Sequence, residues 1–233
     1  MGGTGVQGGR SLLSSPFARG EGMGPVKPPV HPVGPGLGRV LSFGRSWRWI
    51  VVASLLMIAL TAVIQSGMGR SPLGPDGRFG WWEGDVWSSE NSQRVADPYS
   101  FSHIIHGILF FGLLGWAARG LPIRHRFLIA LLLEAGWEVL ENSPLIINRY
   151  REATIALGYA GDSVINSCSD VVMMVIGFGF AWRMRPWVSV AAVAAMEIVC
   201  LLWVRDNLTL NVIMLIHPID AIKAWQSVGH PMP

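Results

Sequence analysis

Five long apolar runs constrain the fold of this chain more than any other feature of its sequence. The first reads WIVVASLLMIALTAVIQSGM, and together the runs cover residues 49–68, 101–118, 126–142, 162–182 and 187–204. A membrane-crossing helix needs about 20 mainly apolar residues, whereas a strand is shorter and alternates. The runs therefore predict an all-α, polytopic helical membrane protein, with about five transmembrane helices in an integral membrane domain over 47–233.

Composition supports a membrane protein and excludes one large class of function. Apolar residues make up 51% of the chain and charged residues 14%, against about 25% charged in a soluble domain, and the mean hydropathy is +0.41. The net charge of +3 comes from dispersed basic residues, whereas nucleic-acid binding needs a basic stripe or patch. We therefore expect membrane lipids, and no nucleic acid, as partners. Cys168 and Cys200 lie inside apolar runs, which favours buried thiols over a disulfide.

The two ends of the chain differ from the apolar runs. Residues 1–46 hold 12 of the 28 Gly and 6 of the 15 Pro, so we expect a disordered tail that cannot bury enough apolar surface to fold. No small-residue cleavage site follows the first run, which favours an uncleaved anchor over a signal peptide. After Val204, the segment RDNLTLNVIMLIHPIDAIKAWQ has a short apolar part interrupted by Pro218. This segment predicts an interfacial or re-entrant helix.

The distribution of Lys and Arg predicts which side of the membrane each loop occupies. The N-terminal tail, the 119–126 loop and the turn at 183–185 together carry eleven basic residues. The segments of the other side, 69–100, 143–161 and the C-terminal tail, carry seven basic and eight acidic residues. Because Lys and Arg concentrate on the cytoplasmic side, we expect a cytoplasmic N-terminus. Five spans place the C-terminus outside, and a sixth short span would reverse only that terminus.

Three glutamates interrupt the third apolar run, in the sequence EAGWEVLENS. Glu134, Glu138 and Glu141 lie at offsets of 0, 4 and 7, which in a helix fall within a wedge of about 60° over a rise of about 10 Å. They predict one acidic stripe, bordered by Trp137 and Asn142. The predicted orientation places Glu134 near mid-membrane and the other two glutamates near the outer surface.

Two further runs carry polar residues at a similar predicted depth. His103 and His106 begin the second run and, three residues apart, share one helix face. Asp162, Asn166 and Asp170 follow a spacing of four residues at the start of the fourth run. Since the second and fourth runs begin outside and the third ends there, these residues are expected to converge in the outer leaflet. The histidines are expected to lie level with the last two glutamates of the stripe.

The convergence predicts a polar pocket inside the helix bundle. An ionisable side chain within a membrane costs roughly 2.5–3.5 kcal/mol even on a lenient scale, so it faces the bundle interior or a watery cavity and acquires a partner. Arg149 and Arg151, in the loop 143–161, are the available cationic partners. Two alternatives stay open. In the first, the polar residues only form hydrogen bonds between helices, and Asp162 is only an N-cap. In the second, the histidines are packed side chains rather than metal ligands.

The first functional hypothesis is a site for an envelope lipid or a lipid-linked headgroup, entered from the outer leaflet. The candidate catalytic residues, as general acids or bases and their partners, are His103, His106, Glu138, Glu141 and Asp162. The candidate substrate-binding residues, with the arginines as a fork for phosphate or carboxylate, are Arg149, Arg151, Asn142, Asn166, Asp170 and Glu134. No metal ligand is assigned and the cofactor is left open. No H-E-x-x-H, G-x-S-x-G or Glu-x-x-His signature identifies a reaction.

Two other classes of function stay open. In a proton- or ion-coupled transporter the carboxylates would form a relay. However, the inner halves of the spans have no ionisable residue away from their ends, and the sequence shows no internal repeat. In a structural or accessory membrane protein the stripe would be glue between helices, and the segment WWEGDVWSSENSQ would be a docking loop or an interfacial belt.

Several long segments also carry a family resemblance. WWEGDVWSSENSQ, FSHIIHG, EAGWEVLENSPLIINRYREATIALGYAGDSVINSCSD and the C-terminal segment lie within about 80–227. In that order they resemble an uncharacterised family of bacterial multi-pass membrane proteins, catalogued as a domain of unknown function. That family is distantly similar to the VanZ-like membrane proteins, which have a polar or His-bearing helix start, then an acidic helix, an Arg and a D-x-x-x-N helix. Here these would be His103 and His106, Glu134 and Glu138, Arg149 or Arg151, and Asp162 with Asn166. The resemblance implies the bacterial inner membrane and a role at the cell envelope, without a settled reaction.

Overall fold

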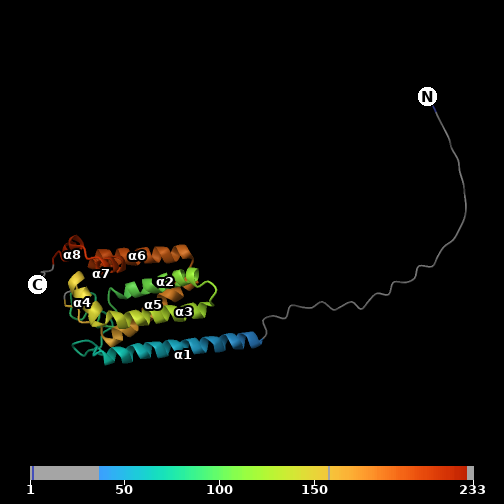
Figure 1. Cartoon of the computed structure of the whole chain (residues 1–233), viewed down its shortest axis with the longest axis horizontal. Coiled ribbons are helices and arrows are strands. Elements are labelled where there is room, and N and C mark those ends of the chain that lie inside the picture. Colours follow the sequence, from blue (N-terminus) through green and yellow to red (C-terminus); the bar gives the residue numbers. More distant parts are fainter. Residues whose placement is uncertain (1, 3–36, 157, 230–233) are drawn as a thin grey trace. The chain divides into compact units, whose positions relative to one another are not determined.

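The computed structural model describes Gly2, residues 37–156 and residues 158–229, and these ranges contain eight helices and no strand (Figure 1). The helices, in chain order, are α1 (Leu37–Gly67), α2 (Ser100–Ala117), α3 (Ile123–Glu141), α4 (Pro144–Ala153), α5 (Val164–Arg183), α6 (Pro186–Val204), α7 (Leu208–Ile216) and α8 (Asp220–Gln226). The prediction of an all-α fold is confirmed for this part of the chain. Cys168 and Cys200 are free thiols, as expected.

Four of the described helices are long and apolar enough to cross a membrane, which indicates a membrane protein. They are the part of α1 from Trp47 to Gly67, and α2, α5 and α6 in full. α3 is not among them, because it carries Arg124, Arg126 and the three glutamates of the stripe within 19 residues. The prediction of five spans is thus not confirmed, because four of the described helices have the length and composition of a span.

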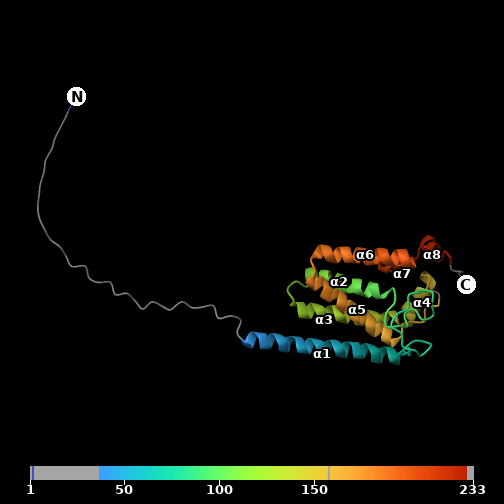
Figure 2. The ribbon, with the colours of Figure 1, turned by 180° about the vertical axis from the view of Figure 1, so that it is seen from behind.

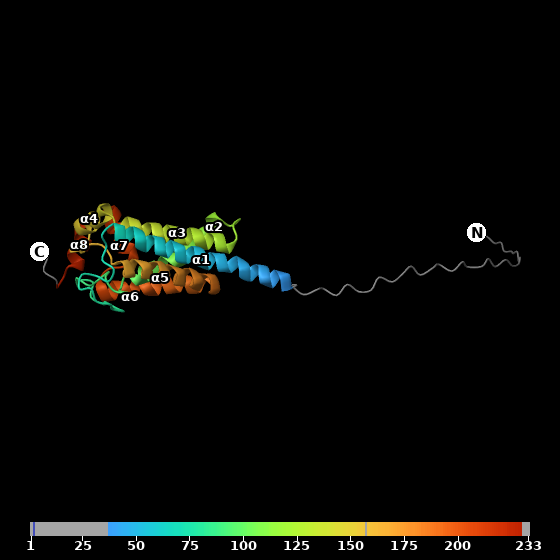
Figure 3. The same cartoon turned by 90° about the horizontal axis from the view of Figure 1, so that it is seen from below.

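The described residues from Leu41 onward form one compact unit. Within that unit the long helices lie side by side, and the shorter α4, α7 and α8 gather at one end (Figures 1 and 2). At this end α1, α3 and α6 finish and α2 and α5 begin; the view from below shows the same arrangement (Figure 3). We call it the polar end, because the buried polar side chains described below lie there.

The closest helix packing is between α2 and α5, and two glycines permit it. A Cβ atom on Gly107 would overlap the carbonyl oxygen of Met174, and one on Gly177 would overlap the carbonyl oxygen of Ile104. Small residues of this kind allow two membrane helices to approach backbone to backbone. The glycine pair therefore sets the distance between the helix that carries the histidines and the helix that carries Asp170.

An apolar core fills the bundle away from the polar end. It consists of buried side chains from α2, α3 and α5 that contact one another: Leu114, Ala130, Leu131, Val171, Met174 and Phe178. The ring of Phe178 also makes edge-to-face contacts with Phe111 and Phe127, with centroids 5.4 Å apart in both cases, a favoured aromatic geometry. This core fixes the three helices that supply most of the polar site.

Helix boundaries mostly agree with the sequence prediction, and three differences have physical causes. α1 begins at Leu37, so the last ten residues of the predicted tail are helical; extending an existing helix adds a hydrogen bond for each residue ordered. Residues 3–36 of that tail lie outside the described residues. The predicted loop 143–161 contains α4, which Pro144 starts at a position where its missing N–H is not needed. The predicted C-terminal helix is two helices, because Pro218 separates α7 from α8.

Candidate functional site

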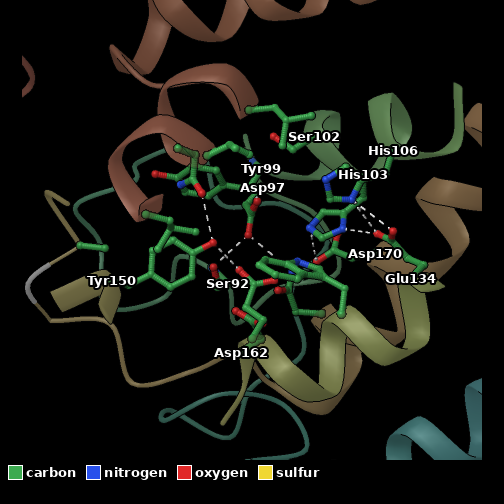
Figure 4. Close-up of a pocket in the computed structure, with 18 of the residues that line it drawn as sticks. Ser92, Asp97, Tyr99, Ser102, His103, His106, Glu134, Tyr150, Asp162 and Asp170 are labelled. Carbon is green, nitrogen blue, oxygen red and sulfur yellow. Dashed lines mark hydrogen bonds and ion pairs between the residues drawn. The ribbon is translucent and has the colours of Figure 1, made fainter. Parts of the chain in front are cut away.

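A cavity of about 360 Å³ opens at the polar end (Figure 4). α2, α3, α4, α5, α7 and the loops before α2 and α5 all contribute to its lining. We call its ionisable side chains, other than tyrosine, the polar cluster; they are Asp97, His103, His106, Glu134, Glu141, Asp162 and Asp170. We call its aliphatic and phenylalanine side chains the apolar rim; they include Phe110, Leu133, Leu208, Val212 and Leu215. The cavity therefore combines a charged interior with an apolar boundary.

Glu134 lies between the two histidines of α2. Its Oε1 is 2.6 Å from His103 Nδ1, and its Oε1 and Oε2 are 3.2 and 3.1 Å from His106 Nδ1. Both Glu134 and His103 are buried, whereas His106 is partly exposed. The sequence prediction paired the histidines with Glu138 and Glu141 in depth. For His103 this is confirmed, because ligand atoms of His103, Glu138 and Glu141 lie within 4.8 Å of one another. The contacts of both histidines with Glu134, about one turn deeper, were not predicted.

Glu138 follows Glu134 by one helical turn and so lies on the same face of α3. Its side chain is completely buried, and neither carboxylate oxygen has a hydrogen-bond partner among the described residues. Its Oε1 lies 3.3 Å from Nδ1 of His103, the nitrogen that also faces Glu134. On the other side of the ring, Nε2 of His103 is 3.8 Å from Asp170 Oδ2. His103 is thus surrounded by three carboxylates from two helices.

Asn142 and Asp162 connect the end of α3 to the start of α5. Asn142 Nδ2 donates to Asp162 Oδ2 over 2.8 Å, and the backbone N–H of Asp162 donates to Asn142 Oδ1 over 2.7 Å. The N-cap of α5 is Ser163, whose hydroxyl accepts from the backbone N–H of Asn166, so the alternative of Asp162 as the cap is wrong. Burial raises the pKa of Asp162, against the hydrogen bonds from Tyr159 and Asn142.

Asp97 closes the cavity from the loop that precedes α2. Its carboxylate accepts from the backbone N–H groups of Tyr99 (2.7 Å), Ser100 (3.3 Å) and Ser92 (3.0 Å). Burial raises the pKa of Asp97 to about 6, with the nearby Asp162 acting in the same direction and the backbone hydrogen bonds opposing. Sequence reasoning did not select Asp97, although an acidic residue three positions before a helix start is a capping signal.

Three tyrosines complete the lining and were also missed from the sequence. Tyr99 donates its hydroxyl to Asp206 (3.1 Å), Tyr150 to Glu141 (2.8 Å) and Tyr159 to Asp162 (2.8 Å). Each phenol lies beside a carboxylate; Tyr150 is buried and the other two are half-buried. Desolvation raises the pKa of all three. They are therefore neutral donors at physiological pH. Their spacing gave no signal, because the loop 154–163 folds back to bring Tyr159 to the cavity.

The structure brings most of the predicted site residues together, but not the two arginines. Arg149 donates to the backbone oxygens of Leu215 (2.8 Å) and Ile216 (3.3 Å), at the end of α7. Arg151 donates to the backbone oxygen of Tyr159 over 2.5 Å. Neither arginine is among the residues that line the cavity. They hold α7 and the loop 154–163 in place, and helix carbonyl ends are favourable partners for a cation.

The charge balance of the cavity follows from these placements. Five carboxylates and two histidines form the polar cluster, Glu138 lies directly beside it, and no Lys or Arg is among the described residues that line the cavity. Charges of one sign in a poorly hydrated site repel strongly unless protons or cations balance them. The arrangement can therefore hold protons, bind cationic or hydroxyl-bearing groups, or coordinate a metal ion through His and Glu.

A family model matches residues 65–228, which covers α2 to α8 and every residue of the polar cluster. The chain belongs to this family, described as a protein of unknown function (DUF2585). The match covers most of the chain and begins at Gln65. The resemblance expected from the sequence is thus confirmed at the level of an uncharacterised family.

Curated relatives of this DUF2585 protein come from several bacteria. A UPF0314 protein of Sphingopyxis alaskensis is 52% identical over 181 residues, covering 78% of this chain and 95% of its own. UPF0314 proteins of Rhizobium johnstonii and Agrobacterium fabrum are 50% and 48% identical and cover 75% and 80% of this chain, and 90% and 93% of their own. No solved structure matches the chain.

Proposed function

We propose that this DUF2585 protein is a multi-pass protein of the bacterial inner membrane that binds the headgroup of an envelope lipid, or of a lipid-linked intermediate, in its cavity. In this proposal α3 is the fifth span, the N-terminus is cytoplasmic and the polar end faces the outer leaflet. The proposed role at the envelope agrees with the VanZ-like order of motifs noted in the sequence.

The packing of α3 supports its role as a fifth span. Ala130 and Leu131 are fully buried in the apolar core, and Glu134 and Glu138 are fully buried on the same side of the helix. The carboxylates of α3 therefore face other helices rather than lipid, which is how ionisable residues are accommodated within membranes. Leu132 and Leu133 are 63% and 47% exposed and present an apolar surface to the outside of the bundle.

The orientation rests on the distribution of basic residues. The loops at the end opposite the polar end, 119–126 and 183–185, carry five basic residues and no acidic residue. The polar end carries acidic and basic residues in similar numbers, and its Arg94 pairs with Asp76 (2.7 Å) and Glu90 (3.0 Å). Since Lys and Arg concentrate in short cytoplasmic loops, the polar end is proposed to be outside.

The observation that carries the proposal is the two-part lining of the cavity. The buried polar cluster suits a headgroup, and the apolar rim suits the first part of a hydrocarbon chain. Within the rim, Leu133 and Val212 are 47% and 44% exposed, so the rim reaches the surface of the bundle between α3 and α7. A water-soluble ligand would need no such apolar path, whereas a lipid would enter along it.

The charge of the cavity narrows the headgroup chemistry. With no Lys or Arg in the described lining, a bare phosphate would find no permanent positive charge, and five carboxylates would repel it. Amino and hydroxyl groups donate hydrogen bonds to carboxylates, and those from an ammonium group are stronger. We therefore propose an amino- or sugar-bearing headgroup, with Glu141, Asp162 and His106 as its nearest partners and as the candidate acids or bases.

Lipid binding is tested by native mass spectrometry of the purified full-length protein in mild detergent. Phosphatidylethanolamine and phosphatidic acid with the same acyl chains are added separately, in the presence of a chelator. We expect phosphatidylethanolamine to be retained more strongly. Val212→Trp, which blocks the rim without changing charge, should abolish retention. Glu152→Gln, a carboxylate change at an exposed residue of α4 outside the cavity lining, should leave retention intact. Equal retention of the two lipids, or retention by Val212→Trp, would overturn the proposal.

Part of the polar set supports a structural role alongside the site. Gln65 of α1 donates to the backbone oxygen of Glu138 (3.1 Å) and to the hydroxyl of Ser167 (2.8 Å). Asn142 Nδ2 donates to the same serine over 3.3 Å. These buried bonds join α1, α3 and α5 away from the cavity lining, as interhelical glue does. A transporter is less favoured, because the apolar core lies between the polar cluster and the opposite end of the bundle.

A further inference from the structure

The innermost part of the cavity has the composition of a metal site. Two groups of three side chains, which share His103, offer ligand atoms within 4.8 Å of one another: His103, His106 and Glu134, and His103, Glu138 and Glu141. Four ligands held tetrahedrally at about 2.0–2.1 Å from a metal ion lie about 3.3 Å apart. The separations of His106 Nδ1 from Glu134 Oε2 (3.1 Å) and of His103 Nδ1 from Glu138 Oε1 (3.3 Å) are close to that value.

A second, independent observation points to a missing positive partner. Glu138 is completely buried and neither of its oxygens has a hydrogen-bond partner among the described residues, although Oε1 is directed at His103. A buried carboxylate without partners is costly. The nearest donor nitrogen, His103 Nδ1, already faces Glu134 at 2.6 Å. One cation between these side chains would satisfy both carboxylates at once.

The surroundings of His103 also fit a metal ligand. If Nδ1 coordinates an ion, Nε2 carries the proton and needs an acceptor. Asp170 Oδ2 lies 3.8 Å from that nitrogen, on the far side of the ring. A carboxylate behind a ligating histidine, which fixes its tautomer and orientation, is the usual second shell of a protein metal site. The helix pair held together by Gly107 and Gly177 supplies both residues.

We propose that His103, His106, Glu134 and Glu138 bind one divalent transition-metal ion at the inner end of the cavity, with Asp170 orienting His103. Two neutral imidazoles and two carboxylates exactly balance a charge of +2, and this mixture of nitrogen and oxygen ligands suits Zn²⁺, Fe²⁺ or Mn²⁺ better than a thiolate-seeking ion. Because His106 is partly exposed to the cavity, the ion would be reachable by a bound headgroup. This role of the ion rests on the proposed function, whereas its binding does not.

The test uses metal alone, without added lipid. The full-length protein in detergent is stripped with a chelator, dialysed, loaded with Zn²⁺ and analysed for zinc content and affinity. We expect about one zinc per chain. His106→Ala and Glu138→Gln should each weaken binding at least about tenfold, since even outer-shell changes cost 10- to 100-fold. Glu152→Gln, a matched carboxylate-to-amide change at an exposed residue of α4, should bind zinc as the unchanged protein does.

Absence of stoichiometric zinc, or equal binding by Glu138→Gln and Glu152→Gln, would overturn the metal site. If the ligand variants fail to accumulate, X-ray absorption of the zinc-loaded unchanged protein decides. Imidazole and carboxylate ligands at about 2.0–2.1 Å support the proposal, and a shell of water or sulfur contradicts it. Lipid retention is measured in chelator, so the lipid proposal and the metal proposal fail separately.

Discussion

At the residue scale, Glu134 is the side chain on which the cavity most depends. It is fully buried and contacts both histidines of α2. The sequence places it deepest of the three glutamates, near mid-membrane, where a buried hydrogen bond and a member of a site look alike in a helical pattern. Its partners could not be predicted, since the relative shift of two helices depends on the packing of the apolar core and not on the spacing within either helix.

Replacing Glu134 by Gln tests the buried pair. The variant keeps the shape of the side chain but leaves His103 facing a neutral amide, and removal of one partner from a buried ion pair typically costs about 3–5 kcal/mol. We expect a clear loss of thermal stability in detergent with chelator present, measured as the melting temperature. Glu141→Gln should cost less, because Tyr150 still donates to the remaining amide oxygen at that position. Equal melting temperatures for the two variants would contradict the central place of Glu134.

Asp206 provides a pH-dependent contribution to stability outside the spans. Its carboxylate accepts from Tyr99, from the backbone N–H of Asn207 and from Gln226, yet burial raises its pKa from 3.8 to about 6. The folded protein therefore holds this proton more tightly than the unfolded chain does. Stability gained from the protonated form is present below about pH 4 and is lost as pH rises to about 6.

The Asp206→Asn variant should remove this part of the pH dependence. Between pH 4 and 6 the free energy of unfolding of the unchanged protein should fall relative to that of the variant, on the order of 1–3 kcal/mol. Its melting temperature should fall relative to that of the variant over the same range. Above pH 6 the difference should be constant. The measurement is a pair of melting curves at each pH, so groups common to both proteins cancel. A constant difference across the whole range would exclude a raised pKa at this residue.

At the element scale, the contact between α2 and α5 depends on two glycines. Gly107→Ala and Gly177→Ala would each place a methyl group against the backbone of the facing helix, and overpacking of this kind costs about 1–3 kcal/mol. Gly112→Ala and Gly179→Ala, on the same two helices, meet no atom within 4 Å and remove a glycine from a helix, which favours stability. Melting temperatures should fall for the first pair only, and a fall for both pairs would refute specific contact.

The helices were far easier to predict than their partners. Apolar runs of membrane length located α2, α3, α5 and α6 within a few residues, because length and composition alone determine a spanning helix. α4 was not found, since its ten residues include three charged side chains and no continuous apolar stretch. Nor could the sequence show that Arg149 and Arg151 serve α7 and a loop rather than the cavity, because a long side chain can reach several partners.

At the scale of the whole molecule, Glu197 shows how the polar end is assembled. This acidic residue of α6 lies within a predicted span. Its carboxylate accepts from the backbone N–H groups of Leu208 (3.1 Å) and Thr209 (3.2 Å), at the start of α7. An acidic group at a helix N-terminus satisfies free donors and the helix dipole. The carboxylate of Glu197 thus holds α7 over the cavity, and α7 supplies part of the apolar rim.

The side of the membrane on which this assembly lies determines what can enter the cavity. In the proposed topology, the loop 68–99 is outside and the loop between α2 and α3 is cytoplasmic. Arg78→Cys and Gly120→Cys place one thiol in each loop; Arg78 and Gly120 are both exposed, and a Cβ on Gly120 meets no atom within 4 Å. In intact cells of a bacterial host, a membrane-impermeant maleimide should label Arg78→Cys and leave Gly120→Cys unlabelled until the membrane is opened.

The unchanged protein, with its half-buried Cys168 and buried Cys200, measures the background. The reverse pattern would place the polar cluster in the cytoplasmic leaflet and exclude outer-leaflet lipids as ligands, while leaving the metal proposal intact. Labelling of both positions from outside would contradict α2 as a span. If the expected pattern is found, the acidic cavity faces the compartment in which envelope lipids are displayed, and the carboxylates of α3 gain an exposed route for exchange of protons and cations with the outside.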